Sequence, residues 1–170
     1  MQKQQNSSEF DLKSPLLWDY LKDKSVLMWG EGKRHVPFLD LNDNVGKALA
    51  FARRCGSLRV GLEQIQTILE MEEAGLALKQ KKLQEPLKDK LEIGENISRV
   101  MLMSNDGADR FYRHSETILN RYSHRLLGVK LNISSLALGH IFYGRDNKAV
   151  KAIFVDRKDA VLRVLSSFLS

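Results

Sequence analysis

From Asp43 to the end of the chain, apolar residues recur mainly at intervals of three and four positions. This spacing places them on one face of a helix, as in amphipathic helices that cover a hydrophobic core. The longest such segment runs from Leu58 to about Gln84, and Leu69 lies at the centre of its apolar stripe. We therefore expect a long helix over residues 58–84 that buries Leu69 against a partner helix. The other apolar members of the stripe are Leu58, Leu62, Ile65, Leu76 and Leu83.

Capping residues and glycines divide most of the remaining chain into further helices. Ser14 followed by Pro15 suits the start of a helix, and Asn42 or Asp43 suits the N-cap of another. Gly128 suits the position just after the end of a helix. Besides the 58–84 segment, the predicted helices cover residues 14–23, 44–55, 86–104, 106–127, 132–143 and 146–170, the last as one bent helix or two short ones.

Residues 26–41 do not fit this helical pattern. Two short apolar runs flank the stretch Gly30–Gly32, and Pro37 interrupts the second run. Such a pattern favours a β-hairpin or an irregular loop. The sequence thus predicts a mostly α fold, a single-domain bundle of about seven helices over residues 13–170. It has one short β-hairpin or loop insertion near residues 26–41 and a flexible N-terminal tail over residues 1–12.

The composition is that of an ordinary globular chain and changes this picture little. Of the 170 residues, 43% are hydrophobic and 28% are charged, and no apolar run reaches the roughly 18 residues that cross a bilayer. Cys55 is the only cysteine, which excludes an intramolecular disulfide and a cysteine-based zinc site. The polar opening residues do not resemble a signal peptide. We expect a cytoplasmic protein with no cofactor, no metal and no membrane partner.

The net charge of +6 is concentrated toward the C-terminus. Residues 105–170 hold 11 basic and 6 acidic side chains, a balance of +5. Residues 61–104 hold 6 basic and 8 acidic side chains, a balance of −2. A basic segment of this kind favours polyanionic partners, and nucleic acid is the first candidate among them.

The stretch RFYRHSETILNRYSHRLLG, residues 110–128, places most of its basic side chains along one side of the predicted helix. On a helical wheel they form a stripe about four turns long beside an apolar face. Arginine donates paired hydrogen bonds that match phosphate oxygens, so such a row suits a helix lying along a nucleic-acid backbone. Two further basic residues follow Tyr143. The predicted nucleic-acid-binding residues are Arg110, Arg113, His114, Arg121, His124, Arg125, Arg145 and Lys148.

The stripe also has less specific interpretations. Its arginines can form salt bridges with glutamates of an adjacent helix, such as Glu70, Glu73 or Glu95. A lone histidine on a helix is far more often structural than catalytic. The chain has no nucleophile–base pair, metal-spaced histidine set or dinucleotide motif, and GEGKRH at residues 30–35 lacks the spacing of a phosphate loop. We therefore do not expect an enzyme.

These observations favour a non-catalytic basic subunit that binds the backbone of RNA or DNA, together with other protein subunits, in a larger nucleoprotein complex. Small subunits of RNA-guided effectors are one example, a comparison that rests only on size, charge and helicity. The alternative is a protein–protein adaptor or assembly subunit, for instance of viral or phage type. Such a protein would use the apolar stripe of the 58–84 helix to contact another chain.

Overall fold

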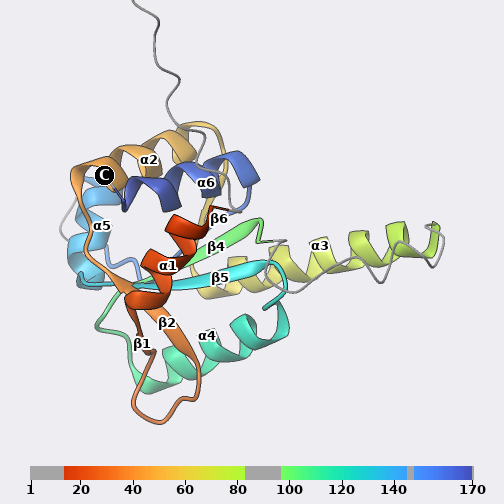
Figure 1. Cartoon of the computed structure of the whole chain (residues 1–170), viewed down its shortest axis with the longest axis horizontal. Coiled ribbons are helices and arrows are strands. Elements are labelled where there is room, and N and C mark those ends of the chain that lie inside the picture. Colours follow the sequence, from red (N-terminus) through yellow and green to blue (C-terminus); the bar gives the residue numbers. More distant parts are fainter. Residues whose placement is uncertain (1–13, 83–96, 145–147, 170) are drawn as a thin grey trace, which may run out of the picture.

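The structure is a computed structural model of the whole chain, and it describes residues 14–82, 97–144 and 148–169. In these residues six helices and six strands form an α/β fold, in which a mixed β-sheet lies between two layers of helices (Figure 1). The prediction of a bundle of about seven helices is therefore wrong. The tail expected over residues 1–12 lies outside the described residues.

The sheet has the strand order β1-β2-β5-β4-β6-β3, and its centre is parallel. Strands β2, β5 and β4 run in the same direction, whereas the β1–β2, β4–β6 and β6–β3 pairs are antiparallel. Because parallel strands end at the same edge of a sheet, the loops that follow β2, β4 and β5 lie at one edge. The strands span Ser25–Leu27 (β1), His35–Leu39 (β2), Leu58–Val60 (β3), Arg99–Met103 (β4), Leu126–Leu131 (β5) and Ala152–Val155 (β6).

Helices cover both faces of the sheet, and each layer has its own hydrophobic core. Helices α1, α2, α5 and α6 pack on one face, and α3 and α4 pack on the other (Figure 1). The N-terminal ends of α3 and α4 lie close together on their face of the sheet. The helices span Pro15–Asp23 (α1), Asp43–Arg54 (α2), Leu62–Lys82 (α3), Asp109–Arg121 (α4), Ser135–Tyr143 (α5) and Lys158–Ser167 (α6).

Strands β4 and β6, and the first two residues of β5, lie where the sequence predicts helices. They occupy the middle of the sheet, so most of their residues are buried between the two helical layers. In β4, Val100 and Leu102 belong to one core, and Met101 and Met103 belong to the other. A strand that is buried on both faces lacks the alternation of polar and apolar residues, and its period does not distinguish it from a buried helix.

The same misinterpretation displaces several predicted boundaries. The helix predicted over residues 106–127 ends at Arg121, and Gly128 lies within β5 rather than after a helix. A Cβ atom at Gly128 would lie 2.6 Å from Leu119 Cδ1, so this glycine lets α4 pack directly on the strand. The described part of the 86–104 segment contains β4 instead of a helix. The described part of the 146–170 segment contains β6 followed by α6.

Elements with clear start and stop signals are confirmed. The hairpin predicted near residues 26–41 is present, as β1 and β2 pair antiparallel. Helix α1 begins at Pro15, and the Asn42 side chain accepts a hydrogen bond from the Val45 N–H at 2.9 Å at the start of α2. Gly144, with a φ of 67°, ends α5 in the left-handed conformation that favours glycine.

The long predicted helix is present only in part. Leu58 belongs to β3, and Gly61, with a φ of 96°, turns the chain from that strand into α3. Leu69 is fully buried, as predicted, and lies in the same core as Ile65. Leu76, however, is 41% exposed, because the C-terminal half of α3 extends beyond the sheet (Figure 1).

A buried ion pair holds the first half of α3 against the rest of the molecule. The Arg125 guanidinium, which precedes β5, donates to Glu72 at 2.7 Å and to the Leu69 carbonyl at 3.2 Å. Glu72 also pairs with Arg99 of β4 at 3.1 Å. Arg125 is only 6% exposed, so its charge depends on these partners for compensation.

Arg125→Ala should lower the free energy of unfolding by about 3 kcal/mol, because it leaves the Glu72 carboxylate and the Leu69 carbonyl without their buried donor. Arg121→Ala is the matched control, and it should cost less than about 1 kcal/mol. The Arg121 side chain is 52% exposed and forms its ion pairs at the surface. Urea unfolding followed by circular dichroism measures both losses, and similar losses would contradict the role given to Arg125.

Candidate functional site

Helix α4 carries half of the eight residues that the sequence analysis selected. One face of α4 packs on the sheet through Tyr112, Ser115, Ile118 and Leu119. The Tyr112 hydroxyl donates to the Ser104 carbonyl at 2.7 Å and accepts from the Gly107 N–H at 3.1 Å. Burial raises the pKa of Tyr112, which keeps the hydroxyl protonated. These bonds fix the loop between β4 and α4 and thereby the position at which α4 begins.

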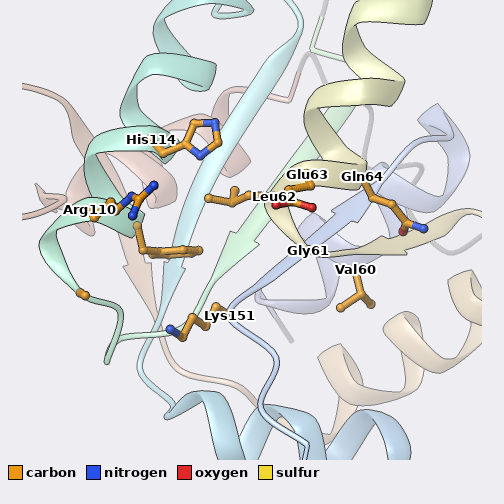
Figure 2. Close-up of a pocket in the computed structure, with 10 residues that line it drawn as sticks. Val60, Gly61, Leu62, Glu63, Gln64, Arg110, His114 and Lys151 are labelled. Carbon is orange, nitrogen blue, oxygen red and sulfur yellow. The ribbon is translucent and has the colours of Figure 1, made fainter.

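A pocket of about 800 Å³ lies between the N-terminal ends of α3 and α4, and we call it the α3–α4 pocket. Its base is the sheet edge where β3 ends and β6 begins, since the Gly61 N–H donates to the Ala152 carbonyl at 3.1 Å. Figure 2 shows its polar side chains coming from separate elements, with Arg110 and His114 on α4, Glu63 on α3 and Lys151 before β6. The lining residues with functional side chains are Glu63, Gln64, Arg110, Phe111, His114 and Lys151.

Two of these residues bring positive charge to the pocket. Arg110, in the first turn of α4, and Lys151, just before β6, are exposed. In the described part of the chain neither forms an ion pair with a carboxylate. Their charges therefore remain available to an anionic ligand in the pocket.

His114 adds a hydrogen-bonding group one turn further along α4. Its Nε2 lies 2.8 Å from the Gln66 Oε1 on α3, which links the two helices. With the amide oxygen as acceptor, Nε2 carries a proton and Nδ1 is the second polar atom of the ring. This contact orients the imidazole.

The backbone contributes further positive potential to the pocket. Residues 62–64 and 109–110 form the first turns of α3 and α4, whose N–H groups have no partner within the helix. A helix N-terminus carries a partial positive charge that favours anions. Glu63 lies in the first turn of α3 and also lines the pocket, so one carboxylate faces these positive groups.

The C-terminal half of the predicted stripe is not part of this pocket. Arg121 pairs with Glu73 at 2.8 Å and with Glu70 at 3.8 Å, so the interpretation as a salt-bridged helix face is confirmed for this residue. Arg125 is buried with Glu72, and both His124 and Arg125 lie in the turn after α4. His124 is exposed there. Glu95, the third glutamate considered, lies outside the described residues.

The remaining predicted residues lie in two other places. Arg113 lies outside the pocket on a neighbouring side of α4, with its guanidinium 5.8 Å from the centroid of the Trp29 ring. Lys148 lies on the far face of the sheet beside α5, with its ammonium 4.4 Å from the centroid of the Tyr143 ring. Arg145 lies outside the described residues. The structure thus brings together Arg110 and His114 and separates the other predicted residues from them.

Glu116 anchors the β1–β2 hairpin to the side of α4 that carries Arg113. Its carboxylate accepts hydrogen bonds from Trp29 Nε1 at 2.8 Å, the Lys33 N–H at 2.8 Å and the Arg34 N–H at 2.7 Å. Partial burial would raise the pKa of Glu116, but these three bonds and the charge of Arg34 outweigh it and lower the pKa below its ordinary range. The carboxylate is therefore ionised at neutral pH and holds the loop in place.

Sequence reasoning missed Lys151 and Glu63, because both depend on the order of the strands. Lys151 precedes β6, which the helical prediction did not contain, and the Ser104 N–H binds the Lys151 carbonyl at 2.9 Å at the end of β4. Glu63 follows β3 by three residues and was assigned to the interior of a longer helix. Recognition of β3 and β6 as strands would have brought both residues to one edge of the sheet.

Comparison with protein families and with curated proteins finds no match to this chain, so the function is inferred from the site itself. Among the described residues, no three of His, Cys, Asp and Glu lie close enough together to hold a metal ion. None of the helices in residues 14–82, 97–144 and 148–169 is long and apolar enough to cross a membrane.

Glu116→Gln should lower the free energy of unfolding by about 2 kcal/mol, the value of a hydrogen bond to a charged group. Glutamine supplies one oxygen, and its NH₂ group would face one of the three donors now bound to the carboxylate. Thermal unfolding and Trp29 fluorescence measure the loss. Asp109→Asn, an exposed carboxylate on the same helix, is the charge-matched control and should cost less than about 1 kcal/mol.

The same carboxylate should contribute a pH dependence. Because its pKa is lowered in the folded state, its contribution is fully present above the unfolded glutamate pKa of about 4.3 and is lost as the pH falls through the lower folded value. Below that unfolded value, wild-type stability should fall more steeply than that of Glu116→Gln. Parallel pH profiles for the two proteins would show that the carboxylate does not hold the hairpin.

Proposed function

We propose that the protein binds the phosphate backbone of nucleic acid without catalysis, using Arg110, Lys151 and His114 in the α3–α4 pocket. The observation that carries the proposal is that one pocket at the N-terminal ends of two helices is lined by an imidazole held by Gln66 and by two cations that have no carboxylate partner among the described residues. Guanidinium, ammonium and backbone N–H groups are the donors that phosphate oxygens accept from most often. Arg110 and His114 were selected from sequence for the same chemistry.

The distribution of ion pairs supports this part of α4 over its C-terminal half. Arg121 and Arg125 are already paired with glutamates of α3, so a phosphate would have to compete with those carboxylates. Arg110 and Lys151 have no such competitor among the described residues. A cation without a carboxylate partner gains most from a bound phosphate.

The surface beside the pocket extends the path that a strand can follow. Arg113 stands over Trp29 on the neighbouring side of α4, and Lys33 lies exposed on the hairpin loop that Glu116 holds. An arginine stacked on an aromatic ring keeps its charge and can still donate to phosphate. The +5 balance of residues 105–170 would also attract a polyanion over a longer range.

The structure bears differently on the comparison with RNA-guided effectors and on the expected protein partner. The comparison with small helical subunits of RNA-guided effectors rested on size, charge and helicity, and the six-stranded sheet removes the helicity. A protein partner is favoured by α3, which exposes Met71 at 70% and, in its projecting half, Leu78 at 64%. Exposed apolar residues of this size on a projecting helix are typical of contact surfaces. We propose that binding takes place in the cytoplasm.

Fluorescence anisotropy with a labelled single-stranded oligonucleotide tests the proposal. Arg110→Glu with Lys151→Glu should weaken binding at least about tenfold at moderate salt and, by removing two phosphate contacts, lower the salt slope of log affinity by about 1.5. The matched control is Lys22→Glu with Lys158→Glu, which reverses two exposed lysines of α1 and α6 on the opposite face of the sheet. This control should bind nearly as tightly as the wild type.

Two results would contradict the proposal. Equal weakening by the pocket variant and the control would mean that net charge alone determines affinity. Failure of the wild-type protein to bind RNA or DNA at moderate salt would leave α3 and a protein partner as the better basis for function. Circular dichroism of each variant establishes that a loss of binding is not a loss of fold.

A further inference from the structure

We infer that the α3–α4 pocket takes a single ribonucleotide that carries a terminal phosphate, either as a free nucleotide or at the end of an RNA strand. The inference deepens the proposed function and rests on it. It names the ligand of the pocket, whereas the proposed function requires only that phosphates bind there.

The pocket is chemically asymmetric, and this asymmetry suits a nucleotide better than a bare phosphate. Figure 2 shows Arg110 and His114 on one side, Glu63 on the α3 side and Lys151 at the base between them. A site for phosphate alone has no use for Glu63, since a carboxylate repels the anion. A carboxylate in a nucleotide site has a familiar partner, because it accepts hydrogen bonds from ribose hydroxyls.

Glu63 is free to serve this role. It is exposed, and among the described residues its carboxylate forms neither an ion pair nor a hydrogen bond. This distinguishes it from Glu70, Glu72 and Glu73 further along α3, which all pair with arginines. The one α3 carboxylate that lines the pocket is therefore the one left without a partner among these four.

The apolar part of the lining provides a surface for a base. Phe111 lines the pocket beside Arg110, and Leu62 and Val60 continue the apolar lining toward β3. The ring of Phe111 is held in place by an edge-on contact with Tyr112, with 5.1 Å between the ring centroids. Gly107 packs against Phe111 so closely that a Cβ atom there would lie 2.5 Å from the ring. A base can stack on an aromatic ring fixed in this way.

The size and charge of the pocket favour the end of a strand. A volume of about 800 Å³ lies within the range of small-molecule pockets and accommodates a nucleotide. A terminal phosphate carries about two negative charges at neutral pH, whereas a phosphate within the backbone carries one. Arg110 and Lys151 together match the terminal group, and Glu63 then binds the ribose beside it.

The experiment compares four labelled oligonucleotides of one sequence by anisotropy. They are RNA with 5′- and 3′-terminal phosphates, the same RNA with hydroxyl ends, and the two corresponding DNA strands. The phosphorylated RNA should bind at least about tenfold more tightly than the hydroxyl-ended RNA, because it adds a charged group with charged donors. It should also bind about tenfold more tightly than phosphorylated DNA, the value of one hydrogen bond to a charged acceptor.

Variants assign these preferences to the pocket. Glu63→Gln should reduce the RNA-to-DNA ratio to near one while keeping the preference for a terminal phosphate, and Arg110→Gln should remove the phosphate preference. Glu70→Gln, a carboxylate of the same helix outside the pocket, should change neither ratio. Competition by a free nucleoside monophosphate, added as adenosine 5′-monophosphate, distinguishes the two sources: displacement at micromolar concentration indicates a free nucleotide, and displacement only at millimolar concentration indicates an RNA end.

Failure of this inference differs from failure of the proposed function. Equal binding of all four oligonucleotides, with loss in the Arg110→Glu and Lys151→Glu variant, would overturn the ribonucleotide assignment and leave backbone binding intact. Absence of binding to every oligonucleotide would contradict both. Unchanged ratios in Glu63→Gln would overturn the role given to that carboxylate.

Discussion

The arrangement of α3 and α4, and of the pocket between them, depends on the ion pair of Arg125 with Glu72. A buried guanidinium requires compensation, and Arg125 finds it only if α3 lies beside the start of β5. Because the same guanidinium also binds the Leu69 carbonyl, the position of α3 along its axis is fixed as well as its distance from the sheet. The distance between α3 and α4 follows from this, and with it the width of the pocket at their N-terminal ends.

The ion pairs between α3 and α4 separate the basic residues of this face into two groups, those paired with glutamates and those without such a partner. At and just after the C-terminal end of α4, Arg121 and Arg125 form ion pairs with glutamates of α3, and these pairs stabilise the fold. At the N-terminal end of α3, Glu63 forms no ion pair, and Arg110 and Lys151 stay without carboxylate partners among the described residues. A count of basic residues along the helix does not separate these groups, since the difference lies in what faces each residue across the interface. The net charge therefore does not show how many cationic side chains are available to a polyanion, because some of them are already paired with glutamates.

The predictable parts of the structure are those specified by neighbouring residues. Caps and glycines marked α1, α2 and the end of α5 correctly, because their signals lie within a few positions of the boundary. The central strands carried no such signal, since burial on both faces makes an apolar run look the same in a strand and in a helix. In the candidate site, Arg110 and His114 were accessible to sequence reasoning because they share one turn of α4. Lys151 and Glu63 reach them only through the strand order, which pairs segments far apart in the chain.

The position of Glu63 shows how one residue can satisfy the fold and the site together. A carboxylate in the first turn of a helix is stabilised by the helix dipole, so Glu63 favours the start of α3 whether or not a ligand binds. The same position places it in the lining of the pocket, where its charge would reduce the repulsion between Arg110 and Lys151 in the unbound protein. A bound phosphate would take over that compensation, and Glu63 would then be free to accept from a neutral donor such as a hydroxyl. If the charges of the pocket are rebalanced in this way, it would discriminate between a ligand that brings both a phosphate and a hydroxyl and one that brings the phosphate alone.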